Sequence, residues 1–303
     1  MDTFRTHPDF FPATERCARG LVGMYRGHRL LNRILNDRGR VVFGLFALYL
    51  DATPDENGVG LTVTRIATLC QETNVCSRGR AKAMVMLMRW AGYLDIGGET
   101  GPNRRQRPLV PTPRLLQEQI NRWRQLCGAL AMLHPPAEDV LARIEDPVFA
   151  RTLVREIGSR FHAGVRLLHY APQASVFAER DAGILIAMSL LISGAEGDAF
   201  PPEQPVPVPV AALARQFFVS RAHVLKLMRE AEQEGLIART PSPTGSVHLL
   251  EPLRSGMVAF FAAMFSVLAD AGDAALVAAG EAPSFPASAG GQVFAPRDQT
   301  AHP

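Results

Sequence analysis

The chain has 303 residues, 47% of them hydrophobic, and a formal net charge of +3. This length and apolar content are sufficient for two ordinary domains, each with a core of its own. The four cysteines have no C-x-x-C spacing, and no paired histidine cluster accompanies them, which excludes a zinc site of the usual kind.

The N-terminal residues include the acidic Asp2 and contain no apolar segment of the kind that signal peptides carry. The longest apolar run, Met257 to Ala269, is too short to span a bilayer. We therefore expect a cytoplasmic protein that has no contact with a membrane.

Positive charge is concentrated in one part of the chain. Residues 62–125 contain eleven basic and four acidic residues, a net charge of +7, whereas residues 207–270 contain six and five, a net charge of +1. The region 126–206 has six and ten, a net charge of −4. A local basic excess is typical of a surface that contacts nucleic-acid phosphates.

In chain order, residues 1–13 are expected to form a loose arm. Apolar spacing then predicts helices in four segments: 14–36, 40–50, 113–133 and 138–170. The proline-rich stretch 201–209 is expected to be an extended connector. Residues 272–303, rich in Ala, Gly, Ser and Pro, are predicted to form a disordered tail.

The same order of elements occurs twice, at residues 62–112 and 207–252. Each copy has an apolar helix, a break, a Ser-Arg helix start, a second apolar helix, a Gly-aliphatic stop and a turn-rich hairpin. When Gly92 and Gly235 are aligned, the predicted buried positions of the second helices align as well. These positions are Ala81, Met84, Val85 and Met88 in the first copy, and Val224, Leu227, Met228 and Ala231 in the second. This order predicts a winged helix-turn-helix in each copy.

The turn between the two helices differs in length between the copies. The dipeptide 66–67 matches 213–214, and this register makes the turn about four residues longer in the first copy, from Cys70 to Cys76. We interpret these two cysteines as reduced thiols. The alternative is a redox sensor whose oxidation would disturb DNA binding.

The repeat extends into the flanking helices. Residues 37–48 resemble 179–190, and residues 29–31 resemble 166–168, in the spacing of charged and apolar positions. The sequence therefore predicts a mainly α protein with tandem winged helix-turn-helix units, small β-hairpin wings and flanking helices. The predicted parts are a first unit with its flanking helices, a helical connector and linker, a second unit and a tail: 14–133, 134–206, 207–271 and 272–303.

Side chains on the outward face of the first copy are the main candidates for contacts with DNA. Ser77 is the predicted N-cap of the second helix. Small residues at 79 and 83 would allow close approach to the bases, and basic side chains suit guanine edges and phosphates. The basic candidates are Arg78, Arg80, Lys82 and Arg89 on the helix, and Arg104, Arg105 and Arg107 on the wing.

The second copy is a weaker candidate. Its outward face has Arg221, His223, Lys226 and Arg229, but acidic residues follow closely and its hairpin tip has no basic residue. It either binds DNA weakly or holds the first unit through pseudo-symmetric packing.

An apolar patch lies near the end of the second copy, made by Phe260, Phe261, Met264 and Phe265. The patch fits an ordinary core. Two alternatives are a dimer interface and an effector pocket lined by Phe and Met.

These features resemble the MarR-like branch of the winged-helix transcription regulators. The resemblance is carried by 66–67, by the segment from Ser77-Arg78 to Gly92-Tyr93-Leu94, by the wing up to Arg107, and by the matching residues of the second copy. It implies a DNA-binding regulator whose flanking helices form a two-fold interface. Two units in one chain depart from that family. So does the segment 95–97, which stands where the family usually has Asp-x-Arg.

The leading hypothesis is a regulator of transcription that binds double-stranded DNA mainly through the first copy. The alternatives are a plasmid-type tandem winged-helix replication initiator and a winged-helix scaffold for protein contacts. The sequence has no Gly-rich phosphate loop, nucleophile elbow or paired catalytic carboxylates, so we expect neither an enzyme nor a cofactor. A homodimer and a small-molecule effector are left open as partners.

Replacement of the three wing arginines, Arg104, Arg105 and Arg107, by alanine should weaken binding to every DNA sequence, because phosphate contacts carry no sequence information. The dependence of the dissociation constant on salt should also become flatter. Titration of labelled duplexes at several salt concentrations measures both effects. A salt slope equal to that of the unmodified protein would contradict the wing assignment.

Overall fold

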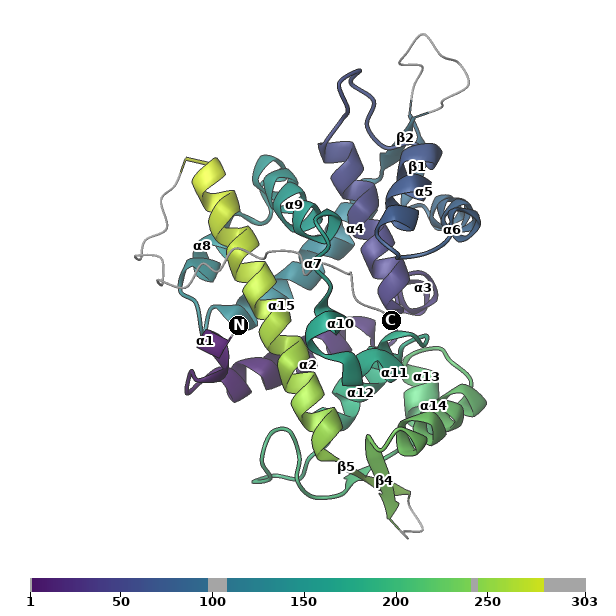
Figure 1. Ribbon diagram of the computed structural model, residues 1–303, viewed down its shortest axis with the longest axis vertical. Coiled ribbons are helices and arrows are strands. Elements are labelled where there is room, and N and C mark those ends of the chain that lie inside the picture. The colour runs from purple at the N-terminus through teal and green to yellow at the C-terminus, as the bar shows by residue number, and fades with distance from the viewer. Residues whose placement is uncertain (1, 98–107, 241–244, 281–303) are drawn as a thin grey trace, which may run out of the picture.

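The computed structural model describes residues 2–97, 108–240 and 245–280. Helices make up most of this part of the chain, and its strands form two small antiparallel sheets (Figure 1). The predicted mainly α class is confirmed.

Both halves of the chain consist mainly of helices. The first half contains α1 (Asp2–Arg5), α2 (Phe10–Tyr25), α3 (Arg29–Ile34), α4 (Arg38–Ala52), α5 (Val63–Glu72), α6 (Arg78–Trp90), β1 (Leu94–Ile96), β2 (Leu109–Pro111), α7 (Pro113–Leu130) and α8 (Pro136–Arg143). The second half contains α9 (Pro147–His162), α10 (Leu167–Tyr170), η1 (Pro172–Ala174), α11 (Ser175–Ala178), α12 (Gly183–Leu191), β3 (Val206–Pro207), α13 (Val210–Gln216), α14 (Arg221–Gln233), β4 (Ile237–Thr240), β5 (Ser246–Leu249) and α15 (Glu251–Ala278).

Two segments have a similar order of elements, and we call them the first module (α5, α6, β1 and β2) and the second module (β3, α13, α14, β4 and β5). The second module has one additional strand, because β3 pairs with β5. In Figure 1 they lie along the same edge of the view, one toward each end of the long axis. Each hairpin is antiparallel: Leu94 pairs with Pro111 in the first, and Ile237 with Leu249 in the second. The element order expected from the repeat is therefore present in both copies.

Equivalent residues start and end the second helix of each module. The hydroxyl of Ser77 accepts the N–H of the residue three positions on at 3.3 Å, and Ser220 does the same at 3.0 Å. After the helices, Gly92 and Gly235 have φ values of 74° and 66°, a left-handed conformation that glycine adopts without strain. These two signals made the register of α6 and α14 predictable.

The chain leaves both modules through the same backbone contact. The N–H of Thr112 donates to the carbonyl of Tyr93 at 3.0 Å, and the N–H of Leu250 donates to the carbonyl of Leu236 at 3.0 Å. Thr112 and Leu250 are the N-caps of α7 and α15. Positions counted from these two residues are therefore equivalent in the long helices that follow.

The predicted register of α5 against α13 is wrong. The hydrogen bond that closes the turn after α5 runs from the N–H of Val75 to the carbonyl of Cys70, at 2.9 Å. After α13 it runs from the N–H of Val219 to the carbonyl of Ala214, at 3.1 Å. Ala214 therefore corresponds to Cys70 and not to Ala67.

The turn is consequently longer in the first module by one residue, Cys76, rather than by about four. The additional length of the first module lies instead at the start of α5. The dipeptides 66–67 and 69–70 are both buried on this helix. Because they lie one helical turn apart, apolar spacing alone could not choose between them.

Helices from the two halves pack on one another in reciprocal pairs. Within the halves, α2 packs on α7 and α9 packs on α15; between them, α4 packs on α9 and α12 packs on α2. The buried apolar side chains of both halves form one continuous cluster. The region 134–206 therefore contributes core helices, whereas the sequence predicted a connector. The apolar spacing in this region indicated helices. It could not show which helices they pack against, because those helices lie far away in the chain.

The two ends of the described chain are more ordered than predicted. In the expected loose arm, α1 packs against α15, and Phe10 is fully buried at the start of α2. At the other end, α15 continues to Ala278, beyond the predicted start of the tail at 272. The rest of that predicted tail, from 281 on, lies outside the described residues.

The helix α15 is long and apolar enough to cross a membrane by length and composition, in contrast to the shorter run expected from the sequence. However, 67% of its most apolar window is buried within the structure. Phe260, Phe261 and Phe265 are among these buried side chains. This burial within the chain favours the interpretation of the patch as an ordinary core over the dimer-interface alternative.

Replacement of Gly158 by alanine should lower the free energy of unfolding by about 1–3 kcal/mol, the usual result of overpacking. A Cβ atom at this position of α9 would lie 2.4 Å from the ring of Tyr49 on α4. The matched control is Gly23→Ala on α2, where a Cβ atom meets nothing within 4 Å. That change should be neutral or stabilising by up to about 1 kcal/mol. Urea unfolding measures both, and equal midpoints would argue against the close packing of α9 on α4.

Candidate nucleic-acid interface

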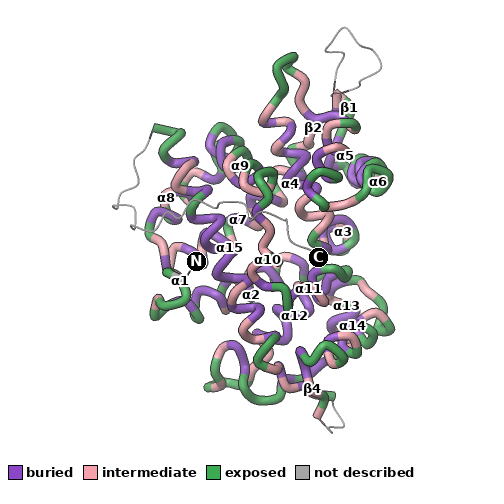
Figure 2. Tube along the Cα trace, viewed as in Figure 1, coloured by how far each residue is buried: buried purple, intermediate pink, exposed green. Residues whose placement is uncertain are grey.

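The helix α6 has one buried apolar face, and its basic side chains lie outside that face. Ala81, Met84, Val85 and Met88 are buried, as predicted. The basic candidates are all exposed on the other side: Arg78, Arg80, Lys82 and Arg89. Figure 2 shows this outward surface of α6 as exposed. The structure thus exposes all four helix residues that the sequence singled out.

The charges on this face are not neutralised within the described chain. The helix contains no acidic residue, and none of its four basic side chains lies within ion-pair distance of a carboxylate in the described residues. The guanidinium of Arg78 donates to the hydroxyl of Thr68 on α5 at 3.0 Å, which holds the side chain at the start of α6. An exposed helix face with four uncompensated positive charges attracts anionic partners.

Backbone hydrogen bonds close the base of the first hairpin. The N–H of Gly97 donates to the carbonyl of Pro108 at 2.9 Å, which continues the pairing of β1 with β2. The N–H of Leu109 also donates to the carbonyl of Leu61 at 2.9 Å, so β2 contacts the residues that lead into α5. The wing candidates Arg104, Arg105 and Arg107 lie outside the described residues.

The basic side chains of the second module are partly used in internal contacts. His223 Nε2 lies 2.9 Å from the backbone carbonyl of Asp181, which joins α14 to the segment before α12. The Nζ atom of Lys226 lies 3.8 Å from the Oε1 atom of Glu230 on the same helix. Of the predicted candidates, Arg221, Lys226 and Arg229 are exposed, and His223 is partly buried.

A salt bridge on the same face of α14 joins it to the residue next to Asp181. The guanidinium of Arg180 donates two hydrogen bonds to the carboxylate of Glu230, at 2.9 and 3.1 Å. These bonds hold the pKa of the Glu230 carboxyl below its ordinary value. These contacts of α14 lie within the second half, so they occupy some of its polar groups without showing that the second module holds the first.

Sequence reasoning missed two features next to the basic face of α6, the exposed indole of Trp90 and its contact with Arg33. Trp90 is 69% exposed, one helical turn after Met86, which is 71% exposed. The guanidinium of Arg33, on α3, lies 5.8 Å from the centre of the Trp90 ring. The spacing of 82, 86 and 90 could have placed Trp90 on this face. No sequence signal connects Arg33 with it, because α3 reaches α6 only in the folded chain.

The two cysteines of the α5–α6 turn do not have the character of reactive thiols. Cys70 is buried, Cys76 is partly buried, and both are free. Burial raises the pKa of both thiols, which lowers the fraction present as thiolate at neutral pH. This favours the interpretation as reduced structural cysteines over that of a redox sensor.

Comparisons with known proteins do not assign the chain to a family. No family model matches it, and neither the curated proteins nor the solved structures contain a significant match.

Replacement of Ser77 by alanine should destabilise the protein by about 1 kcal/mol, because the first turn of α6 loses its side-chain cap. Replacement by aspartate should retain most of the stability, since its carboxylate accepts the same N–H and suits the positive end of the helix dipole. Thermal unfolding of both variants checks this. If the alanine variant unfolded at the same temperature as the unmodified protein, the cap would contribute nothing to stability.

Proposed function

We propose that this protein binds double-stranded DNA mainly through α6 of the first module and regulates transcription. In this proposal both modules are winged helix-turn-helix units, and α6 is the helix that enters the major groove. The repeated order of helix, turn, helix and hairpin supports it, together with the equivalent caps, glycines and turn hydrogen bonds of the two modules.

The observation that carries the proposal is the difference in charge between the two second helices. They have the same length, the same cap and the same buried stripe. Yet α6 has four basic residues and no acidic residue, whereas α14 includes Glu230 and Glu232. Packing within the protein does not require a face like that of α6. Binding to a polyanion does, because each phosphate contact needs an available positive charge.

The chemistry of the face suits a major groove. Gly79 and Ala83 are exposed and small, so the backbone of α6 can approach the edges of the bases. The side chains of Arg80 and Lys82 flank them. An Arg that forms a bidentate contact with guanine typically contributes about 1–3 kcal/mol of discrimination. The other basic side chains would neutralise phosphates and set the orientation of the helix.

A second candidate function is a scaffold for protein contacts. Met86 and Trp90 favour it, because large exposed apolar side chains are common in protein interfaces. Failure of the protein to retain duplex DNA at low salt would support this alternative over the leading one.

The tandem replication initiator is a third candidate, supported by the reciprocal packing of two similar halves in one chain. It shares the DNA interface but requires repeated sites at an origin. Mapping of the DNA fragments bound in cells separates it from a regulator, which should occupy promoters.

The double variant Arg80→Ala, Lys82→Ala should bind a pool of random-sequence duplexes more weakly than the unmodified protein. Removal of one phosphate interaction should reduce the slope of log affinity against log salt by about 0.9. The matched control is Lys226→Ala, Arg229→Ala on α14, which removes the same charge and should have a smaller effect. Fluorescence anisotropy at several salt concentrations measures both slopes. Equal reductions in the two variants would refute the assignment of DNA binding mainly to α6.

A further inference from the structure

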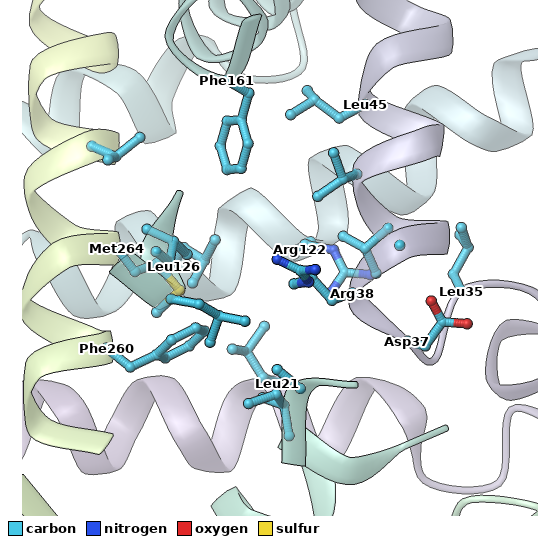
Figure 3. A pocket seen from close by; sticks show the side chains of 18 of the residues that line it. Leu21, Leu35, Asp37, Arg38, Leu45, Arg122, Leu126, Phe161, Phe260 and Met264 are labelled. Carbon is cyan, nitrogen blue, oxygen red and sulfur yellow. The ribbon is translucent and has the colours of Figure 1, made fainter. Parts of the chain in front are cut away.

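The first module has a depression on its surface that is separate from the interior of the molecule. The interior cavity, of about 230 Å³, lies between helices of both halves, and Arg38, Arg122 and Phe260 are among its lining residues (Figure 3). The surface depression, of about 320 Å³, lies where α6 meets β1. Its lining residues are Met86, Arg89, Trp90, Leu94 and Asp95. A ligand bound there would lie next to the basic face of α6.

The fold of a module does not require this depression. When Gly92 and Gly235 are aligned, three of its lining positions can be compared between the modules. The first module has Met86, Trp90 and Asp95 where the second has Arg229, Gln233 and Ala238. The second module thus forms the same helix and hairpin without an indole or a carboxylate at these places. Two large apolar side chains exposed around one depression indicate a contact surface.

The indole of Trp90 offers a flat surface for stacking. It is 69% exposed, and the guanidinium of Arg33 lies 5.8 Å from the centre of its ring. This cation–π contact holds the ring against α3. A ring held in this way loses little conformational freedom when a planar ligand stacks on it. Every nucleobase has such a planar face, and stacking on an aromatic side chain is a common source of affinity for unpaired bases.

A carboxylate lies in the same depression. The Oδ1 atom of Asp95 accepts the N–H of Ile96 at 2.7 Å, which orients the group. An ionised carboxylate has further acceptor positions, and it repels phosphates, so its place beside basic side chains suits a ligand that donates hydrogen bonds. Guanine has two adjacent donors on its Watson–Crick edge, N1–H and the 2-amino group, which match the two oxygen atoms of a carboxylate.

Only an unpaired guanine can make both contacts. In a duplex its two faces stack on neighbouring bases, and its donors pair with cytosine. A bulge or a single strand exposes both the face and the edge of the base. Trp90 lies seven residues after Ala83, roughly 10 Å along the axis of α6 at about 1.5 Å per residue. A duplex in contact with the first part of α6 can therefore place an unpaired base next to Trp90.

We propose that the depression between α6 and β1 binds an unpaired guanine of DNA. The base stacks on Trp90 beside Met86, its Watson–Crick edge donates to Asp95, and the adjoining phosphates lie near Arg33 and Arg89. This site rests on the proposed function, because it names the class of DNA that the first module binds, a duplex with an unpaired guanine next to it. A protein partner would also suit the exposed Met and Trp, but it gives no role to the carboxylate.

Fluorescence anisotropy with three labelled duplexes of one sequence tests the site. The first is fully paired, the second has a single bulged guanine, and the third has a bulged inosine, which lacks the 2-amino group. The protein should bind the duplex with the guanine bulge about tenfold more tightly than the paired duplex, because the base stacks on Trp90. The inosine bulge should have an intermediate affinity, since one hydrogen bond to Asp95 is lost.

Variants of the two ligand-binding side chains separate stacking from hydrogen bonding. Trp90→Ala should lose the preference for a bulge, whereas Trp90→Phe should keep part of it, because a phenyl ring also stacks. Asp95→Ala should remove the difference between guanine and inosine but keep the preference for a bulge. The matched control is Leu225→Ala, which removes an exposed apolar side chain from α14 and should bind as the unmodified protein does. All these residues are exposed, and circular dichroism verifies that each variant is folded.

A single-stranded pentanucleotide, thymidylate with one guanine at its centre, tests the site without a duplex. It should quench the emission of Trp90 in the unmodified protein. The chain has two tryptophans, and Trp123 is 3% exposed, so the emission of Trp90→Phe should stay unchanged. Pentathymidylate should quench less at the same concentration, because it lacks the two adjacent donors for Asp95.

The two sets of measurements distinguish this site from the proposed function. Quenching by the guanine pentanucleotide without binding to any of the duplexes would support the site and contradict duplex binding by α6. Equal affinity for the three duplexes without quenching would overturn the site but not the proposed function, and the depression would then fit a protein partner. A preference for the guanine bulge that persisted in folded Trp90→Ala and Asp95→Ala would overturn the site as well.

Discussion

Reciprocal packing between the halves is the constraint on which the remaining architecture depends. The helix α4, which leads into the first module, packs on α9, and α12, which leads into the second, packs on α2. Each module is therefore attached to a helix that the opposite half holds in place. Because protein interiors are close-packed, a shift of either module at this contact would have to displace side chains such as Tyr49 against Gly158.

The two modules differ in which of their polar and charged side chains have partners within the chain. The second module uses some of its polar groups in contacts within its own half: His223 contacts the carbonyl of Asp181, and Glu230 is paired with Arg180. The first module leaves the basic side chains of α6 in solvent without carboxylate partners in the described chain. Surface ion pairs contribute little to stability, so this difference matters more for the choice of partner than for folding.

The same asymmetry recurs at the centre of the molecule. Arg122 and Phe260 occupy equivalent positions on α7 and α15, yet one is a cation and the other an aromatic ring. The arginines of the cavity are also connected to the first module, because Arg166 donates to the carbonyl of Thr73 in the α5–α6 turn. The electrostatic differences at the surface and in the interior thus both involve the first module.

Local signals in the sequence were enough to predict the helices of each module, because Ser77, Ser220, Gly92 and Gly235 mark their ends chemically and apolar spacing marks their buried faces. The exposed basic face of α6 followed from the same spacing. The pairing of α4 with α9, the contact of Arg33 with Trp90 and the cavity around Arg122 could not be predicted. Each joins residues far apart in the chain, and helix periodicity shows which face is buried but not which helix covers it.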